Sequence, residues 1–397
     1  MFEDIKQFSP AVRHFLIATF LMGLSNGMFD TVYNFYLEAR SVDKTKIGYI
    51  YAVAMCMMAG VVIPLIYLSR RMSQKKLLII FSFIYAVPFI LLPIVSSVWV
   101  SAITLGLILS GMIALLSLGN SLTGSNTKSE SRTILFSCFF VAYLGAAMIG
   151  SLIVGFITHY LKSMALISFQ LILLTSFISS ILMIYFRFKS IVGLSEPEND
   201  ARKFTWGNKM EWRNLSKLFL ASLFLGASIT LIFRFVNVLF NLAYSMSLSE
   251  ISLIMSIDKI ISIVGALFSP LLINKLTLKP TIMIIGILTA LCLYLQSLHI
   301  SVVTFILLYF IRLLLNYCLM PLLDTLAITG FSTERTLLST SVRQLAFYLG
   351  SALSAITYGR LLCSGIVNLV TNSEVISSLH KQIGGNYGKT YKTAFQC

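Results

Sequence analysis

Charged residues are scarce in this sequence: Asp, Glu, Lys and Arg make up only 11% of its 397 residues, against about 25% in soluble domains. Hydrophobic residues account for 57%, so a soluble globule of this size would lack the polar side chains that cover a surface. The composition excludes a cytosolic enzyme, a secreted disulfide scaffold and a disordered chain. It predicts an all-α polytopic membrane protein, whose apolar side chains face lipid.

Motifs for catalysis and metal binding are also lacking. No two of the six cysteines have the C-x-x-C spacing, so neither a disulfide framework nor a metal site is indicated. The sequence contains no G-x-x-x-x-G-K-[ST] nucleotide loop, no H-E-x-x-H and no G-x-S-x-G. We therefore expect no enzyme, no ATP-driven pump, no metal and no cofactor. The first apolar run, of about 25 residues, is too long for the core of a signal peptide.

Eleven apolar runs are long enough to cross a bilayer, which takes about 20 helical residues. They cover residues 12–37, 46–69, 75–95, 97–122, 133–159, 163–186, 216–242, 249–273, 280–298, 301–329 and 336–360. The longest polar stretch between runs separates the first six from the last five. We therefore divide the chain into a six-helix bundle (1–186), a central loop (187–215), a second helical bundle (216–360) and a polar tail (361–397).

Basic residues show how the chain is oriented. The formal net charge is +15, and Lys and Arg concentrate in alternate connections, as in membrane proteins with basic cytoplasmic loops. The other connections between runs hold only Arg40, Lys44, Lys46 and Lys162. We expect a multi-pass protein of the cell membrane, a bacterial plasma membrane, with a cytoplasmic N-terminus and central loop. The basic charge then needs no nucleic acid as a partner.

The two halves of the sequence repeat. Gly23-Leu-Ser25 aligns with Gly226-Ala-Ser228 at an offset of 203, which places Asn34 on Asn237. Further matches follow in order at offsets of 203 to 206: Arg132-Thr133-x-Leu135 with Arg335-Thr336-x-Leu338, Tyr143-Leu144-Gly145 with Tyr348-Leu349-Gly350, and Gly155 with Gly359. Parallel repeats of six helices describe the halves of major facilitator transporters.

The chain resembles the major facilitator superfamily over about residues 10–360. Its connection between the second and third runs, Leu68 to Lys76, resembles the family's G-x-L-A-D-R-x-G-R-K gating loop. The basic residues of that loop are present as Arg70, Arg71, Lys75 and Lys76. Arg70 replaces the usual acid, so the gating clamp is incomplete. The glycines 145, 150 and 155 resemble the glycine-rich fifth helix of the proton-coupled efflux branch.

The resemblance implies two pseudo-symmetric bundles around a cavity lined by the first, fourth, seventh and tenth helices. The twelfth helix of the family is missing, because residues 365–390 contain no apolar run of sufficient length. Either the protein ends after eleven helices, or the chain after about residue 360 is altered. The sequence leaves both explanations open.

Ionisable residues inside apolar runs are the candidate site, since each costs about 2.5–3.5 kcal/mol to insert. Asn26, Asp30 and Asn34 recur every four residues and so share one face of the first helix. Arg234 and Asn237 share a face of the seventh. The predicted substrate and proton site comprises Asp30, Asn26, Asn34, Arg234, Asn237, Arg312, Asp258 and Asp324.

The function predicted from these features is secondary active transport of a small solute by alternating access. Asp30 is the first candidate for the proton site, because a carboxylate in a low-dielectric site binds a proton more readily than one in water. The proton and the solute would exchange in an exporter, which acts as a monomer. An uptake or facilitated-diffusion permease for a sugar, nucleoside or carboxylate is the alternative. A non-transporting membrane remnant is the third possibility.

Overall fold

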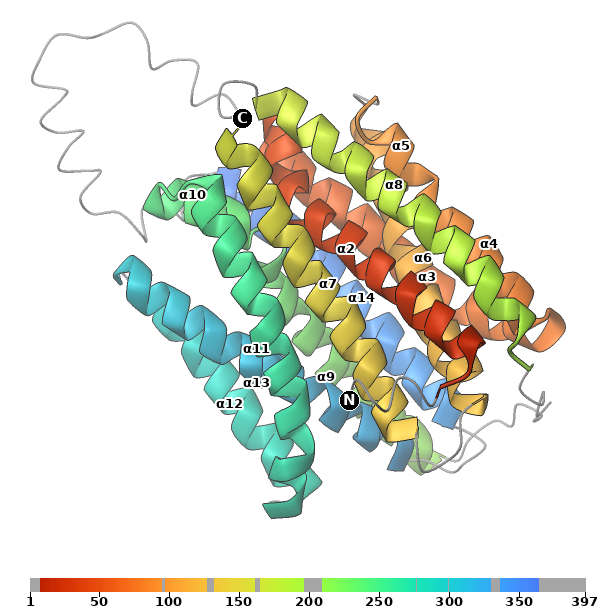
Figure 1. Ribbon diagram of the computed structural model, residues 1–397. Coiled ribbons are helices and arrows are strands. Elements are labelled where there is room, and N and C mark those ends of the chain that lie inside the picture. Colours follow the sequence, from red (N-terminus) through yellow and green to blue (C-terminus); the bar gives the residue numbers. More distant parts are fainter. Residues whose placement is uncertain are drawn as a thin grey trace, which may run out of the picture.

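The computed structural model of the chain is a bundle of long helices (Figure 1). It describes residues 8–94, 97–126, 132–160, 165–195, 209–275, 277–298, 300–329 and 336–363. Within these residues every regular element is a helix, and the connections are turns or irregular segments.

Seven of the described helices or helix segments belong to the first half of the repeat, and the other six belong to the second. The first half contains α2 (Pro10–Ala39), α3 (Lys44–Arg71), α4 (Gln74–Ala86), α5 (Pro88–Leu91), α6 (Val98–Ser125), α7 (Arg132–Tyr160) and α8 (Ala165–Val192). The second half contains α9 (Lys209–Phe233), α10 (Val236–Tyr244), α11 (Leu248–Lys275), α12 (Leu278–Gln296), α13 (Val302–Thr329) and α14 (Thr336–Cys363).

Local sequence explains where several helices begin and end. Ser9 caps α2 by accepting a hydrogen bond from the Val12 amide at 3.3 Å, and Pro10 occupies the first turn, where its missing N–H is not needed. Asp43 caps α3 through the Lys46 amide at 2.9 Å. Pro88 interrupts the third predicted run, because proline cannot donate the helical hydrogen bond, and so separates α4 from α5.

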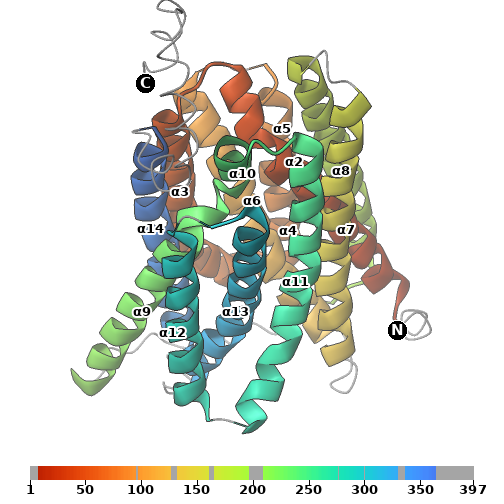
Figure 2. The same cartoon turned by 90° about the vertical axis from the view of Figure 1, so that its left-hand side faces the viewer.

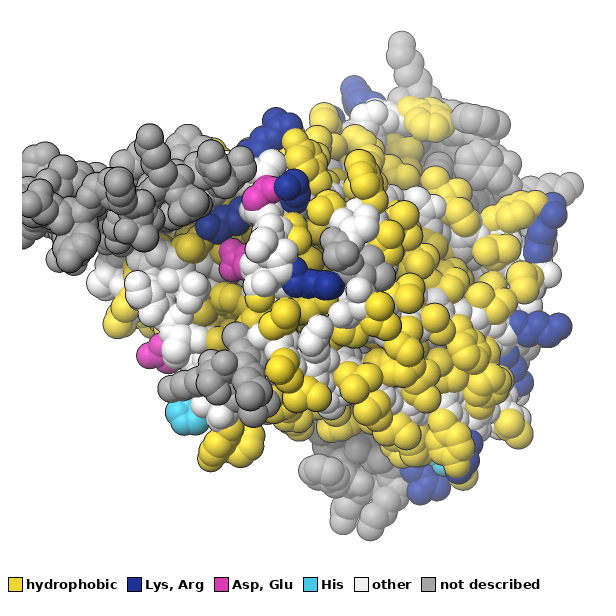
Figure 3. All heavy atoms as spheres, turned by 90° about the horizontal axis from the view of Figure 1, so that it is seen from above, with side chains coloured by type: hydrophobic (Ala, Val, Ile, Leu, Met, Phe, Trp, Pro, Cys, Tyr) yellow, Lys and Arg dark blue, Asp and Glu magenta, His cyan; other side chains and the backbone are white. Residues whose placement is uncertain are grey.

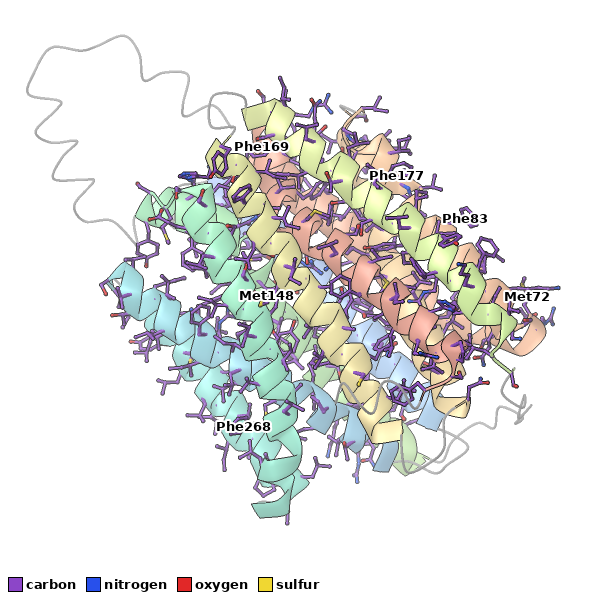
Figure 4. The ribbon with its side chains drawn as sticks, viewed as in Figure 1. Met72, Phe83, Met148, Phe169, Phe177 and Phe268 are labelled. Atoms are coloured by element: carbon purple, nitrogen blue, oxygen red, sulfur yellow. The ribbon has the colours of Figure 1, made fainter. Side chains whose placement is uncertain are left out.

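Nine of the described helices are long and apolar enough to cross a membrane, and the run Pro280–Gln296 of α12 is a shorter candidate. Large apolar side chains cover their outer surface. Phe83 of α4 and Phe268 of α11 are 44% and 48% exposed and project away from the bundle (Figure 4). These features define a multi-pass membrane protein, in which such side chains face lipid.

The predicted repeat is visible in how the helices cross. Gly23 of α2 lies against the backbone of α7, where a Cβ would overlap the Tyr143 carbonyl. Gly226 of α9 lies against α14 in the same way, where a Cβ would overlap the Phe347 carbonyl. Residues separated by 203 positions thus make the same close helix contact in each half. Glycine permits this approach because it has no side chain.

The boundaries between the halves differ from those expected from the sequence. The central loop was predicted to begin at 187, but α8 continues to Val192, and α9 already begins at Lys209. Arg187 is fully buried, with its guanidinium 3.9 Å from the centre of the Phe15 ring. Residues 364–397, which include most of the predicted polar tail and the position of a twelfth helix, lie outside the described residues.

Candidate functional site

A cavity of about 780 Å³ lies between the two halves. Its wall is built from α2, α3, α6 and α7 on one side and from α9, α11, α13 and α14 on the other. Most of the lining is apolar or aromatic, including Met112, Tyr143, Tyr317 and Tyr348. The charged residues of the lining are Asp30, Arg234 and Lys259.

Asp30 and Arg234 meet across the boundary of the halves, as their shared position in the repeat suggested. Arg234 Nη1 lies 3.7 Å from Asp30 Oδ1, and the two side chains are only 16% and 17% exposed. Asn26, one helical turn before Asp30, donates a hydrogen bond from Nδ2 to Asp30 Oδ2 at 3.0 Å. Two of the three residues predicted to share a face of this helix, Asn26 and Asp30, therefore lie on the cavity wall.

Arg234 lies at a break in the seventh predicted run. α9 ends at Phe233 and α10 starts at Val236, although neither proline nor glycine occurs at the break. The Val238 amide bonds to the Asn237 side chain at 2.9 Å, instead of to the Arg234 carbonyl that a continuous helix would offer it. The Arg234 carbonyl instead accepts a hydrogen bond from Asn34 Nδ2 at 2.7 Å.

Asn34 and Asn237 together form a clasp between the halves. Asn34 Nδ2 donates to Asn237 Oδ1 at 2.8 Å, and Asn237 Nδ2 donates to the Thr31 carbonyl of α2 at 3.2 Å. Both side chains are almost completely buried. Neither belongs to the described lining of the cavity. The structure thus brings the two repeat-related asparagines together beside the cavity, where they join α2 to the broken helix.

We call the end of the bundle near this clasp the closed end, since the halves contact each other there. It includes the start of α3, where Gly48 lies against Ala355 and Gly359 of α14. An aromatic contact also crosses this boundary, since the Phe235 ring centre is 5.8 Å from that of Tyr51 of α3. Within the second half, the Phe235 ring centre also lies 5.6 Å from that of Tyr358. The cavity therefore does not continue past these residues.

A second pair of helices, α7 and α11, meets at the same end. Ser256 of α11 donates a hydrogen bond to the Met148 carbonyl of α7 at 3.3 Å, and Ser249 donates to the Gly155 carbonyl at 3.3 Å. Figure 3 views the closed end and shows charged side chains of both signs among apolar ones. In Figure 2, α9 and α11 diverge toward the opposite end. The cavity extends that way, as far as Leu116 of α6 and Pro321 of α13.

Asp258 and Lys259 are adjacent on α11 but point in different directions. Lys259 lines the cavity, whereas Asp258 is fully buried behind it. Lys259 Nζ lies 3.7 Å from Asp258 Oδ1. The Tyr309 hydroxyl donates to Asp258 Oδ2 at 2.8 Å, and Ser262 donates to Oδ1 at 3.4 Å. The predicted site named Asp258 and omitted Lys259, whose side chain is the one that reaches the cavity.

Other predicted site residues lie elsewhere. Arg312 is 2% exposed and packs beside Tyr309, with 5.9 Å from its guanidinium to the ring centre. It is not among the described cavity-lining residues, so its placement in the substrate path is not supported by the geometry. The side chain of Asp324 lies outside the described part of the structure.

The predicted gating residues lie around the turn between α3 and α4, away from the cavity lining. Arg71 stacks over the Tyr67 ring at 4.4 Å. Ser73 caps α4, which begins one residue before Lys75 and Lys76. The Arg70 side chain lies outside the described residues. Among the residues that are described, no group of His, Cys, Asp and Glu could hold a metal ion.

The architecture just described, two repeated helical bundles around a central cavity, is that of a membrane transporter rather than an enzyme. The sequence matches the family model described as Major Facilitator Superfamily over residues 15–355. The chain therefore belongs to the major facilitator superfamily. A search of curated proteins found no match.

Solved structures of transporters share this fold. The nucleoside transporter NupG has 15% sequence identity and a TM-score of 0.70, with 96% of this chain and 100% of that chain covered. A bacterial homologue of the human lysosomal transporter Spinster, inward-facing and unoccupied, has 14% identity and a TM-score of 0.69, with 95% and 87% covered. A D-xylose–proton symporter has 12% identity and a TM-score of 0.66, with 88% of each chain covered.

Proposed function

We propose that the protein is a secondary active transporter that moves a small solute by alternating access. The observation that carries this proposal is the cavity between the halves, closed at one end by contacts between repeat-related elements. Transporters of this kind expose a fixed midplane site to each side in turn, as one half rocks against the other. A cavity with a charged and aromatic lining argues against a non-transporting remnant.

The membrane orientation follows from the basic connections. With the N-terminus and central loop on the cytoplasmic side of a bacterial plasma membrane, the closed end faces outward. The cavity then extends toward the cytoplasm, and the conformation is inward-facing.

Coupling to protons is assigned to Asp30. Its carboxylate lines the cavity, and its partner Arg234 belongs to the other half. The other described ion pairs, Lys46 with Asp43 and Lys259 with Asp258, each join residues of one half. A proton on Asp30 would remove the attraction to Arg234 and so would change the interaction between the halves directly. We therefore propose that Asp30 is where protonation and rocking are coupled.

Export is the proposed direction, on the resemblance of the fifth helix to that of the efflux branch. The glycines of α7 also have a packing role, because Gly150 lies against α2 and Gly155 lies against Ser252 of α11. Such contacts serve helix crossings in a transporter of either direction. The direction is therefore a separate experimental question from the coupling.

The test uses the purified full-length protein in liposomes that enclose a pH-sensitive dye. A thermal-stability screen of nucleosides, sugars and carboxylates first selects compounds that raise the unfolding temperature, as ligands of the folded state do. Addition of a selected compound should change the internal pH with the wild-type protein. Asp30→Asn should abolish this change while the compound still stabilises the protein.

Asp43→Asn is the matched control, since it makes the same chemical change at a helix cap outside the cavity. It should behave as the wild type. Solute movement without any pH change in the wild-type protein would indicate a facilitated-diffusion permease. An unchanged proton signal in Asp30→Asn would remove Asp30 from the mechanism. Vesicles of known protein orientation then show whether the pH gradient drives the compound outward or inward.

A further inference from the structure

Two cationic side chains flank one aromatic ring on the cavity wall. The Arg234 guanidinium carbon and the Lys259 ammonium nitrogen each lie 5.7 Å from the centre of the Phe233 ring. All three residues line the cavity. Phe233 and Arg234 lie at the break that follows α9, and Lys259 lies on α11, so all three belong to the second half. We call these three residues the cationic clamp.

The cations of the clamp have hydrogen-bond donors to spare. Each lies 3.7 Å from its nearest carboxylate oxygen, whereas a charge-assisted hydrogen bond measures about 2.7–2.9 Å. Within the described residues, neither side chain donates a hydrogen bond. The carboxylates are satisfied by neutral donors instead: Asp30 by Asn26 at 3.0 Å, and Asp258 by Tyr309 at 2.8 Å. The N–H groups of both cations are therefore available to an acceptor in the cavity.

The charges around the clamp select the sign of that acceptor. Two cations and two carboxylates, counting Asp30 and the buried Asp258, leave the cluster neutral. A cationic solute would have to approach two cations on the cavity wall and would be repelled in a low-dielectric cavity. A monoanion would meet both cations but would leave one uncompensated negative charge. A proton on Asp30, whose side chain reaches the cavity, would restore neutrality.

The rest of the lining limits the body of the solute. Met112, Tyr143, Tyr317 and Tyr348 provide an apolar and aromatic surface around the charged cluster. The volume of about 780 Å³ falls in the range of about 300–1,000 Å³ typical of small-molecule sites. Such a cavity suits a solute with one charged end and an aromatic or branched apolar body.

We infer that the cavity binds a monocarboxylate with an aromatic or apolar body, whose carboxylate lies between Arg234 and Lys259 while Asp30 takes up a proton. This inference rests on the proposed transport function and names its substrate class. It also changes the expected coupling. Proton and solute bind together rather than in exchange, so both move in the same direction. A proton gradient directed into the cell then drives uptake, and on this point the inference replaces the export proposed from the resemblance of the fifth helix.

The test compares three probes of matched shape: 3-phenylpropionate, its neutral amide, and the cationic 3-phenylpropylamine, with benzoate and 4-methylpentanoate as further carboxylates. Binding to the full-length protein is measured by thermal shift and calorimetry. We expect a carboxylate to bind about tenfold or more tightly than the amide, because a hydrogen bond to a charged group contributes that much. The amine should not bind.

Variants then locate the carboxylate. Lys259→Gln and Arg234→Gln should each weaken carboxylate binding about tenfold or more, and Lys259→Arg should retain it. Lys217→Gln removes the same charge at an exposed position of α9 and should bind as the wild type. In weakly buffered solution, carboxylate binding should take up one proton per molecule, and this uptake should be lost in Asp30→Asn.

Preference for the amine or the amide over the carboxylate overturns the inference, and so does the absence of binding by every carboxylate. Carboxylate binding that Lys259→Gln leaves unchanged also overturns it. None of these measurements requires transport. The comparison of probes uses only the wild-type protein, so it remains decisive even if a variant does not fold. If carboxylates bind as expected but no solute crosses liposome membranes, the proposed function fails while the clamp stands. If a pH gradient drives the amine but not the carboxylates across the membrane, the transport function stands while the clamp inference fails.

Discussion

The clasp between Asn34 and Asn237 should set how much of the protein has its closed end shut. Asn34→Ala removes two hydrogen bonds, at 2.7 Å to the Arg234 carbonyl and at 2.8 Å to Asn237 Oδ1. Asn237 Oδ1 keeps its bond from the Val238 amide, but the Arg234 carbonyl loses the side-chain donor that stands in for the missing helical one. The closed conformation therefore loses stability that the opposite conformation does not.

The magnitude follows from the groups left behind. A buried acceptor without a partner costs about 1–3 kcal/mol. Asn34 Oδ1 itself has no partner in the described structure, so the substitution also removes one unsatisfied group. A net effect of about 1–2 kcal/mol is expected, which shifts the ratio of the two conformations roughly 5- to 30-fold toward the open form.

The assay is a distance measurement by electron paramagnetic resonance between spin labels at Ala39 and Ser247. Both positions are exposed, and they lie in different halves at the closed end. Asn34→Ala should increase the share of long distances. Asn241→Ala is the matched control, because its side chain bonds only within its own segment, to the Met246 carbonyl at 2.9 Å. Equal distributions in the wild type and Asn34→Ala, or an equal shift in the control, would refute the reasoning.

Three further predictions concern the same boundary and the topology. Asp30→Asn and Arg234→Gln should each lower stability, and a double-mutant cycle should give a coupling energy above about 0.5 kcal/mol, as for residues in contact; an additive cycle would show that the pair does not interact. Gly48→Val should hinder closure, because its side chain would meet the backbone of α14, and the same spin-label distances should lengthen. A cysteine at Asn199 should resist an impermeant reagent in intact cells while one at Ser247 reacts, and the opposite pattern would reverse the orientation.

The sequence alone predicted the helical architecture well because its signals are local. Apolar runs of sufficient length located each long helix, and the repeat correctly paired Gly23 with Gly226 and Asn34 with Asn237. The equal depth of Asp30 and Arg234 followed from the same alignment. These predictions depend only on spacing along the chain and on the periodicity of a helix.

The remaining features depend on packing. A helical period places Asp258 and Lys259 about 100° apart, but only the rotation of α11 within the bundle decides which one faces the cavity. The break after Phe233 contains no proline or glycine, so no residue type marks it. Arg187 looked like part of a polar loop, whereas in the structure α8 carries it into the protein beside Phe15. Arg312 shares a helix with cavity residues but is buried in the protein and is not among the described lining residues.

The two ion pairs near the cavity differ in one respect that has mechanical consequences. Lys259 and Asp258 are neighbours on one rigid helix, so their separation is constant however the halves move. Asp30 and Arg234 belong to different halves, and their separation must change whenever the halves rock. A solute held by Arg234 and Lys259 would keep a fixed position relative to the second half throughout the cycle. The first half would then move relative to the bound solute. The distance between Asp30 and Arg234 would be short whenever the closed end is shut.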